Sequence, residues 1–163
     1  MKLNLGCGVH KREGYINIDC NKDVHPDRLL NIEDIEFSKE SIEEVYFSNV
    51  LEHLTLNDAI KILNKIFNWL KPKGKLFIAV PDMKKICKLI SKGKRDKILF
   101  NWIYGEGGNR DSFNHRWGYT EKTLKTILEK IGFIKFSYFS DEPDDSSFCY
   151  EEICLSLNLV CEK

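Results

Sequence analysis

Several features are missing from this sequence, and each absence excludes a class of function. The 163 residues contain 25 basic and 25 acidic side chains, so no overall charge attracts nucleic acid. No apolar run approaches the roughly 20 residues that a membrane-spanning helix needs. No secretory signal is recognisable, because Met1-Lys2-Leu3 already begins a strand pattern. We therefore expect a cytoplasmic protein without a membrane span, for which nucleic acid is an unfavourable partner.

The six cysteines also lack a familiar spacing. None forms a Cys-x-x-Cys pair, so the sequence predicts neither a zinc site nor a redox motif, and we expect no metal. Reduced thiols that serve as small apolar side chains are the simpler interpretation. The apolar fraction of 42% is typical of a globular chain, and the length suits one domain. We therefore expect a single domain over residues 1–163.

Strand and helix patterns alternate along the chain, which predicts a doubly wound α/β sandwich. Helices are expected to begin at Thr55 and Thr120, with Pro72 and Gly74 ending the first and Gly132 the second. The strands are expected at 3–5, 15–19, 29–30, 45–48, 76–80, 133–139 and 153–161. The continuous apolar run at 76–80 suggests a strand that is buried on both faces. A short acidic loop joins the last two strands, and they are therefore expected to be antiparallel.

The most informative motif lies at the end of the first strand, where the chain enters Gly6-Cys7-Gly8. A Gly-x-Gly turn lets the backbone approach a ligand that side chains would block. The second strand ends on Asp19, and a carboxylate in this position can accept hydrogen bonds from two ribose hydroxyls. Together they predict a nucleoside-binding crevice at the carboxyl edge of a parallel sheet.

The same motif lacks the third glycine of a dinucleotide fingerprint, because Lys11 occupies that position. The stretch between Gly8 and Tyr15 is also shorter than the roughly 10–12 residues of a connection that includes a crossover helix. Without that helix there is little support for a pyrophosphate site. A nucleoside without phosphates, such as S-adenosylmethionine, therefore fits better than NAD.

Five blocks in order resemble the class I S-adenosylmethionine-dependent methyltransferases, most closely small ones of glycan and cell-surface pathways. The blocks span residues 3–8, 14–19, 31–37, 45–54 and 70–82. The resemblance implies a Rossmann-like, mostly parallel sheet with an antiparallel last strand, and S-adenosylmethionine as the methyl donor. The chain departs from that family in three respects: no helix precedes the first strand, the first crossover is truncated, and Asn31 replaces the commoner aspartate.

The resemblance also implies which residues bind the donor. Asn31 is expected to face the adenine amine, and Ile32 to offer its backbone N–H to the ring. Ser48 and Asn49 end the fourth strand, where the methionine half of the donor is expected. The full set of expected donor contacts is Leu5, Gly6, Cys7, Gly8, Asp19, Cys20, Asn31, Ile32, Ser48 and Asn49.

The segment 83–119 fits the alternating pattern least. It begins with a lysine-rich, amphipathic stretch, which usually marks a solvated helix face. An insertion after the fifth strand lies beside the cofactor edge, so this segment is the expected substrate lid. His115 is the first candidate for a general base, and His53, in a Leu-Glu-His turn, is the second. The expected acceptor contacts are Tyr104, Asp111, Arg116, Trp117 and Tyr119.

The expected activity is methyl transfer to an oxygen or nitrogen of a small-molecule acceptor, with a sugar or a nucleotide-linked glycan precursor as one candidate. In-line positioning of an activated donor can account for about 7–11 kcal/mol of the barrier. A non-catalytic or degenerate domain that binds S-adenosylmethionine or S-adenosylhomocysteine is the main alternative. An NAD-dependent oxidoreductase and a nucleic-acid methyltransferase remain further options. The neutral charge and the lack of an Asn/Asp-Pro-Pro-Tyr motif disfavour the second of these.

Overall fold

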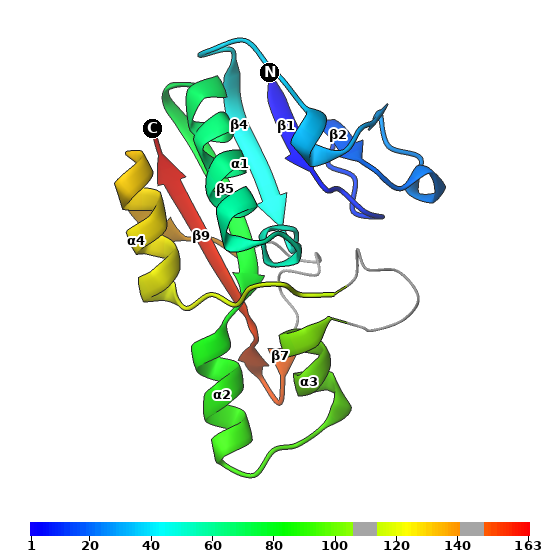
Figure 1. Cartoon of the computed structure of the whole chain (residues 1–163), viewed down its shortest axis with the longest axis vertical. Coiled ribbons are helices and arrows are strands. Elements are labelled where there is room, and N and C mark those ends of the chain that lie inside the picture. Colours follow the sequence, from blue (N-terminus) through cyan, green and yellow to red (C-terminus); the bar gives the residue numbers. More distant parts are fainter. Residues whose placement is uncertain (106–113, 141–148) are drawn as a thin grey trace.

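The computed structural model describes residues 1–105, 114–140 and 149–163, which are arranged around a seven-stranded sheet (Figure 1). The sheet contains β1 (Lys2–Leu5), β2 (Ile16–Asp19), β3 (Arg28–Leu29), β4 (Ile42–Ser48), β5 (Leu70–Pro81), β6 (Ile134–Tyr138) and β9 (Ser156–Glu162). Its strand order is β3-β2-β1-β4-β5-β9-β6, and β9 runs antiparallel to both of its neighbours. The pairs from β3 to β5 are parallel. This order confirms the predicted Rossmann-like class I sheet with an antiparallel last strand.

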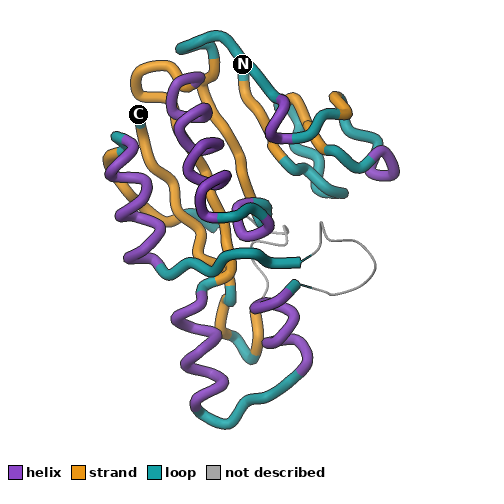
Figure 2. Tube along the Cα trace, in the orientation of Figure 1, coloured by secondary structure: helices purple, strands orange, loops and turns teal. Residues whose placement is uncertain are grey.

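One face of the sheet carries the main core. Helices α1 (Leu56–Trp69) and α4 (Glu121–Ile131) lie side by side on this face (Figure 2). Strand residues alternate between faces, and the paired residues Leu3, Val45 and Leu76 are fully buried in this core. Inward residues of α1 and α4 complete the cluster, including Leu63, Ile66, Leu124 and Leu128.

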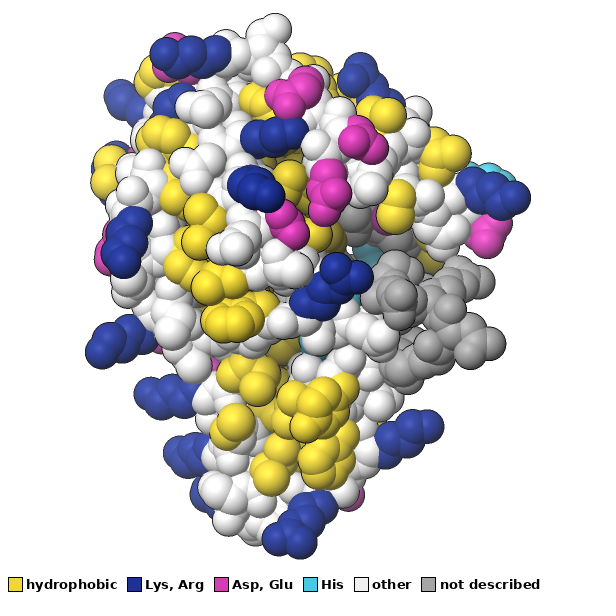
Figure 3. Space-filling view, in the orientation of Figure 1, with side chains coloured by type: hydrophobic (Ala, Val, Ile, Leu, Met, Phe, Trp, Pro, Cys, Tyr) yellow, Lys and Arg dark blue, Asp and Glu magenta, His cyan; other side chains and the backbone are white. Residues whose placement is uncertain are grey.

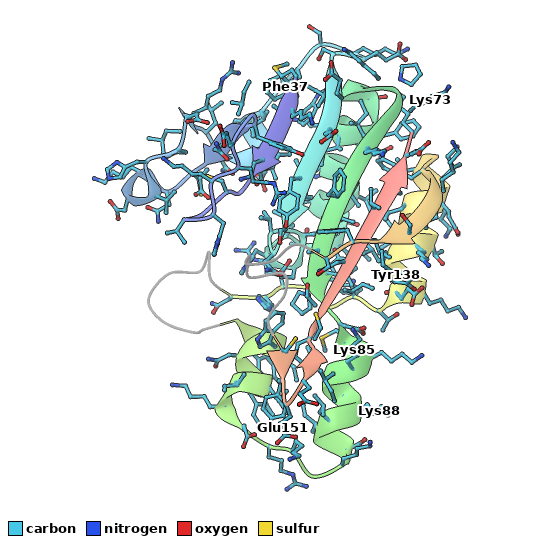
Figure 4. All side chains as sticks on the ribbon, turned by 180° about the vertical axis from the view of Figure 1, so that it is seen from behind. Phe37, Lys73, Lys85, Lys88, Tyr138 and Glu151 are labelled. Carbon is cyan, nitrogen blue, oxygen red and sulfur yellow. The ribbon has the colours of Figure 1, made fainter. Side chains whose placement is uncertain are left out.

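The opposite face is covered by side chains, and no helix of the described residues lies over it (Figure 4). The paired residues Tyr46 and Phe77 point to this side, and Phe77 is only half-buried. The guanidinium carbon of Arg12 lies 3.9 Å from the centroid of the Tyr46 ring. Phe139 packs edge-on against both rings, with centroid distances of 6.0 Å to Tyr46 and 5.5 Å to Phe77. The run 76–80 was expected to be buried on both faces of the sheet. It is fully buried on the face that carries α1 and α4, but on the opposite face Phe77 is only half-buried.

The connections around β2 and β3 are short. Between β1 and β3 the only helical turn is η1 (Lys22–Val24), and η2 (Ile32–Asp34) follows β3. Both are single 3₁₀ turns. A further one, η3 (Leu51–His53), follows β4. Residues 6–15, all of which the structure describes, contain no helix, as the truncated first crossover predicts.

The two long helices begin as the sequence predicts, but the first ends earlier than expected. Thr55 accepts the Asp58 backbone N–H in front of α1. The last helical residue is Trp69, and Leu70 pairs at once with Ile42 in the sheet. Pro72 is the physical reason, because its ring disfavours helical geometry at the residue before it and would clash with a carbonyl four residues back. Pro72 and Gly74 thus lie inside β5.

The start of α4 allows a test of how capping residues stabilise a helix. Thr120 and Thr123 form a capping box, in which each side chain bonds to the other's backbone. We expect Thr120→Ala to lower the free energy of unfolding by about 0.5–2 kcal/mol, because the Thr123 N–H in the first turn loses its acceptor. Urea denaturation measures this change. The exposed Lys122→Ala in the same turn is the control, and an equal loss there would contradict a capping role.

The expected lid segment forms part of a small second unit. Helices α2 (Met83–Ser91) and α3 (Lys97–Tyr104) pack with a hairpin of β7 (Cys149–Tyr150) and β8 (Ile153–Cys154). Their shared core consists of Ile86, Leu89, Leu99, Tyr150 and Leu155. Apolar side chains also gather on the surface of this unit (Figure 3). The predicted strand at 153–161 was therefore too long, because its first residues turn back in the hairpin and β9 begins at Ser156.

The charge pattern predicted a solvated helix face for the lysine-rich stretch, and four of its lysines are exposed. Lys84, Lys88, Lys92 and Lys97 are exposed, and Figure 4 shows Lys88 on the outer side of α2. Within the described residues, every helix is too short or too polar to cross a membrane.

Candidate functional site

The glycine turn is bonded to the end of β2. The backbone N–H groups of Gly6 and Cys7 both donate to the Ile18 carbonyl, at 2.8 and 3.1 Å. The Gly8 N–H donates to Asp19 Oδ2 at 2.8 Å, and the Asn21 N–H donates to Asp19 Oδ1 at 2.8 Å. Each carboxylate oxygen keeps a further lone pair. Asp19 therefore holds the turn in place and can still accept hydrogen bonds from a ligand.

Gly6 is required by two separate features of the turn. Its φ is +65°, a left-handed conformation that is costly for residues with a side chain. A Cβ at this position would lie 2.3 Å from Val50 Cγ2. Gly8 also has a positive φ of +49°, but a Cβ there would meet nothing within 4 Å. The close approach between the first turn and the chain after β4 therefore depends on Gly6.

The end of β4 presents buried polar atoms toward the same edge. Asn49 adopts a left-handed φ of +51°, and its N–H donates to the Ala79 carbonyl at 2.9 Å. Ser48 Oγ and Asn49 Oδ1 are buried without a hydrogen-bond partner among the residues that the structure describes. Buried polar atoms of this kind are uncommon and need an explanation, such as a bound ligand.

The other residues expected to contact the donor differ in exposure. The Leu30 N–H donates to the Asp19 carbonyl at 3.0 Å, so the chain leading to Asn31 starts beside the carboxylate. Asn31 is exposed and makes no capping bond to η2, while Ile32 is half-buried. Leu5 is fully buried at the end of β1, and Cys20 is exposed.

Cys7, at the centre of the glycine turn, is a buried thiol. Burial, together with the negative charge of Asp19, raises the pKa of Cys7 to about 11. The side chain is therefore a neutral thiol at neutral pH, which agrees with its interpretation as a small apolar residue.

The two candidate histidines meet beyond the carboxyl end of β4. The ring centroids of His53 and His115 are 4.8 Å apart in an edge-to-face arrangement. The Arg116 and Trp117 N–H groups donate to the Glu52 carbonyl at 2.7 and 3.1 Å. These bonds hold the stretch before α4 against η3. The structure thus brings together two histidines that are far apart in the sequence.

Burial controls the protonation of this pair. Burial lowers the pKa of His53 below its usual value. Burial and the neighbouring His53 lower the pKa of His115 to about 4. Both imidazoles are therefore neutral near pH 7, and His115 is a weak base.

The expected acceptor residues are only partly assembled around the histidines. The Tyr104 carbonyl accepts the His115 N–H at 3.0 Å, while the Tyr104 side chain is exposed. Arg116 and Trp117 are also exposed. Tyr119 is only 1% exposed and its ring belongs to the main core. Asp111 lies outside the described residues.

Two features of this edge were not singled out from the sequence. Glu52 is 2% exposed and lies beside the histidine pair, and the Leu-Glu-His turn was the signal that could have drawn attention to it. A hollow with a volume of about 540 Å³ lies between α2, β6 and β9, and no predicted site residue lines it. Its lining includes Asp82, Lys85, Tyr138, Ser156 and Asn158.

Comparisons with known proteins agree with this arrangement. Residues 5–136 match a family described as a methyltransferase domain. No curated protein matches the chain. Among solved structures, the chain is similar to an S-adenosylmethionine-dependent methyltransferase from Archaeoglobus fulgidus, with a TM-score of 0.70 and 18% identity over 99% of this chain and 85% of the other.

Two further solved structures share the fold. An S-adenosylmethionine-dependent methyltransferase from Mesorhizobium loti gives a TM-score of 0.61 and 16% identity over 99% and 90% of the two chains. The Burkholderia thailandensis 1,6-didemethyltoxoflavin-N1-methyltransferase, with bound 1,6-didemethyltoxoflavin and S-adenosylhomocysteine, gives 0.61 and 13% over 99% and 70%. At these identities the likeness concerns the fold alone.

Proposed function

The chain belongs to the methyltransferase domain family, and from this premise we propose that it transfers a methyl group from S-adenosylmethionine to an oxygen or nitrogen of a small-molecule acceptor. The observation that carries the proposal is the convergence of Gly6, Asp19 and Asn49 at one edge of a class I sheet. The donor brings a methyl group on a positively charged sulfur, so the protein's main task is to position it.

The described residues fit such a donor at both of its ends. We propose that Asp19, which holds the Gly8 N–H, also accepts bonds from the ribose hydroxyls. Ser48 Oγ and Asn49 Oδ1 are buried acceptors, which suit the ammonium group of the methionine half. Gly6, between these two regions, lets the turn pack directly against the Val50 side chain. We assign adenine contact to Asn31 and Ile32 on the basis of the family resemblance.

We place the acceptor beside the His53 and His115 rings, with Arg116, Trp117 and Tyr104 at its rim. A neutral imidazole can accept a proton from a hydroxyl, but a base with a pKa near 4 accepts it weakly. We propose the unit of α2 and α3 as the substrate lid. A sugar or a nucleotide-linked glycan precursor is our preferred acceptor class, because the five sequence blocks resemble methyltransferases of glycan pathways.

Calorimetry with S-adenosylmethionine, S-adenosylhomocysteine and NAD tests the donor site. We expect both adenosyl compounds to bind with one site per chain and NAD to give no heat of binding. Tighter binding of NAD would contradict the proposal and favour an oxidoreductase.

Transfer itself is tested with methyl-labelled donor and a panel of sugar phosphates and nucleotide sugars. The weak basicity of His115 favours one alternative, a non-catalytic domain that binds the donor or its product. Donor binding with no labelled product from any acceptor class would support that alternative, and label in one class would exclude it.

A substitution at Asn49 provides a sharper test of how the methionine half of S-adenosylmethionine is bound. Asn49→Gly keeps the left-handed backbone but removes Oδ1, so we expect the Kd for S-adenosylmethionine to rise about tenfold, the loss of one charge-assisted bond. Calorimetry measures the Kd. Lys73→Gly, another left-handed position but an exposed and distant one, is the matched control. Equal affinities for the Asn49→Gly and Lys73→Gly variants would exclude Asn49 from the donor site.

A further inference from the structure

Three side chains with metal-binding atoms converge beside the edge of the sheet where we place the methyl donor. One nitrogen of His53, one nitrogen of His115 and a carboxylate oxygen of Glu52 all lie within 4.8 Å of one another. Ligands bound to one ion at about 2.0–2.2 Å lie roughly 3–3.5 Å apart, so small side-chain rotations are enough to bring them around an ion.

Hydrogen bonds hold both imidazoles in a tautomer that suits a metal. His53 Nδ1 contacts the Asn114 carbonyl and His115 Nδ1 contacts the Trp102 carbonyl, each at 3.2 Å. A carbonyl oxygen only accepts, so each Nδ1 carries the proton and each Nε2 keeps its lone pair. Metal-binding histidines usually have this second bond, which sets the tautomer and the orientation of the ring.

The backbone around the three residues is equally restrained. Glu52 and His53 share η3, and the Glu52 carbonyl accepts two N–H groups from the residues directly after His115. Glu52 is 2% exposed, and a carboxylate in such a place gains strongly from a nearby cation. The two elements are therefore held together before any ion arrives.

From this geometry we propose that Glu52, His53 and His115 bind one divalent transition-metal ion. Two imidazoles and a carboxylate suit Zn²⁺ or Fe²⁺ and disfavour Mg²⁺ and Ca²⁺, which prefer oxygen ligands. Three protein ligands leave positions open, as in catalytic rather than structural zinc sites. His53 follows Asn49 closely in the chain, at the end of η3, so the three ligands lie near the expected site of the methyl donor. An oxygen atom of the methyl acceptor can take one of the open positions on the ion. The inference goes beyond the proposed function, since metal binding requires no methyl donor. While an ion occupies both Nε2 atoms, the two imidazoles do not act as proton acceptors.

The experiment is a Co²⁺ titration of protein dialysed against a chelator, followed by visible absorption. We expect one equivalent of Co²⁺ to produce d–d bands without the intense near-ultraviolet band of thiolate ligation. His115→Gln and His53→Gln are each expected to weaken Co²⁺ binding by at least about 100-fold, because one of three ligands is lost. The exposed His25→Gln is the matched control and should bind like the parent chain.

Thermal unfolding provides an independent measurement, because an ion that binds only the folded chain raises the melting temperature. We expect Co²⁺ to stabilise the parent chain and the His25→Gln variant but not the two site variants. If His115→Gln does not fold, His53→Gln carries the comparison, and Glu52→Gln repeats it on the carboxylate. The proposal is overturned by no binding at millimolar Co²⁺, by thiolate bands, or by site variants that bind as tightly as the parent. Donor calorimetry on the same samples shows separately whether the methyl-donor site is intact.

Discussion

A Gly6→Ala variant is expected to lose about 2–5 kcal/mol of unfolding free energy, together with most of its affinity for S-adenosylmethionine. The left-handed φ of +65° costs a residue with a side chain about 1–2 kcal/mol. The added methyl group would overlap Val50 Cγ2 at 2.3 Å, and overpacking of this kind costs about 1–3 kcal/mol more. Relief of the clash separates β1 from the end of β4, which pulls the donor contacts apart. Urea unfolding and donor calorimetry measure the two losses.

Two further variants separate strain from overlap. Gly8→Ala has a similar positive φ but open space around its Cβ, so only the backbone cost of about 1–2 kcal/mol is expected. Val50→Ala in the Gly6→Ala background removes the overlapping atoms and should restore part of the stability. A Gly6→Ala chain as stable as the Gly8→Ala chain would show that the overlap is relieved at no cost and that the turn is not tightly packed.

The second large effect is expected at Asp19. Asp19→Ala should raise the Kd for S-adenosylmethionine ten- to over a hundredfold, since charge-assisted bonds worth about 1.5–3 kcal/mol are lost. The structure adds a second reason, because the same carboxylate holds the Gly8 N–H and so shapes the turn. Calorimetry measures the affinity, and an unchanged Kd would reject any role of Asp19 in donor binding.

The carboxylate at this position is not replaceable by an amide. Both oxygens of Asp19 accept backbone N–H groups, from Gly8 and Asn21, so an amide nitrogen would face a donor on one side. We expect Asp19→Asn to bind the donor nearly as weakly as Asp19→Ala. Asp27→Ala is the control, because Asp27 accepts its bonds from β2 at Asn17 rather than from Gly8. That variant should lose stability while its folded fraction keeps donor affinity.

Local sequence signals and the family resemblance together predicted the class of the sheet and the meeting of the glycine turn with Asp19. The Gly6-Cys7-Gly8 turn and Asp19 lie on adjacent strands, and neighbouring parallel strands end at the same edge. Thr55 and Thr120 mark helix starts through capping chemistry that acts within one turn. These features follow from contacts between near neighbours or between strands whose order the resemblance implies.

The remaining features depend on packing between distant segments. Tyr119 was expected at an acceptor, yet its ring fills the main core, since a Tyr in a loop carries no sign of which way it faces. The hairpin of β7 and β8 brings Tyr150 into one buried cluster with Leu99, an association that no spacing in the sequence reveals. The same holds for Glu52 and His115, which meet only because the chain after α3 returns to η3.

The short connection between β1 and β2 has a consequence for turnover. A crossover helix after the glycine turn would direct the positive end of its macrodipole toward a ligand carboxylate, a contribution of about 0.3–1 kcal/mol. The fully described stretch 6–15 contains no helix, so this attraction is missing for the donor and for its demethylated product alike. We therefore expect both compounds to bind about two- to fivefold more weakly than they would beside such a helix, and the product to leave the site correspondingly faster.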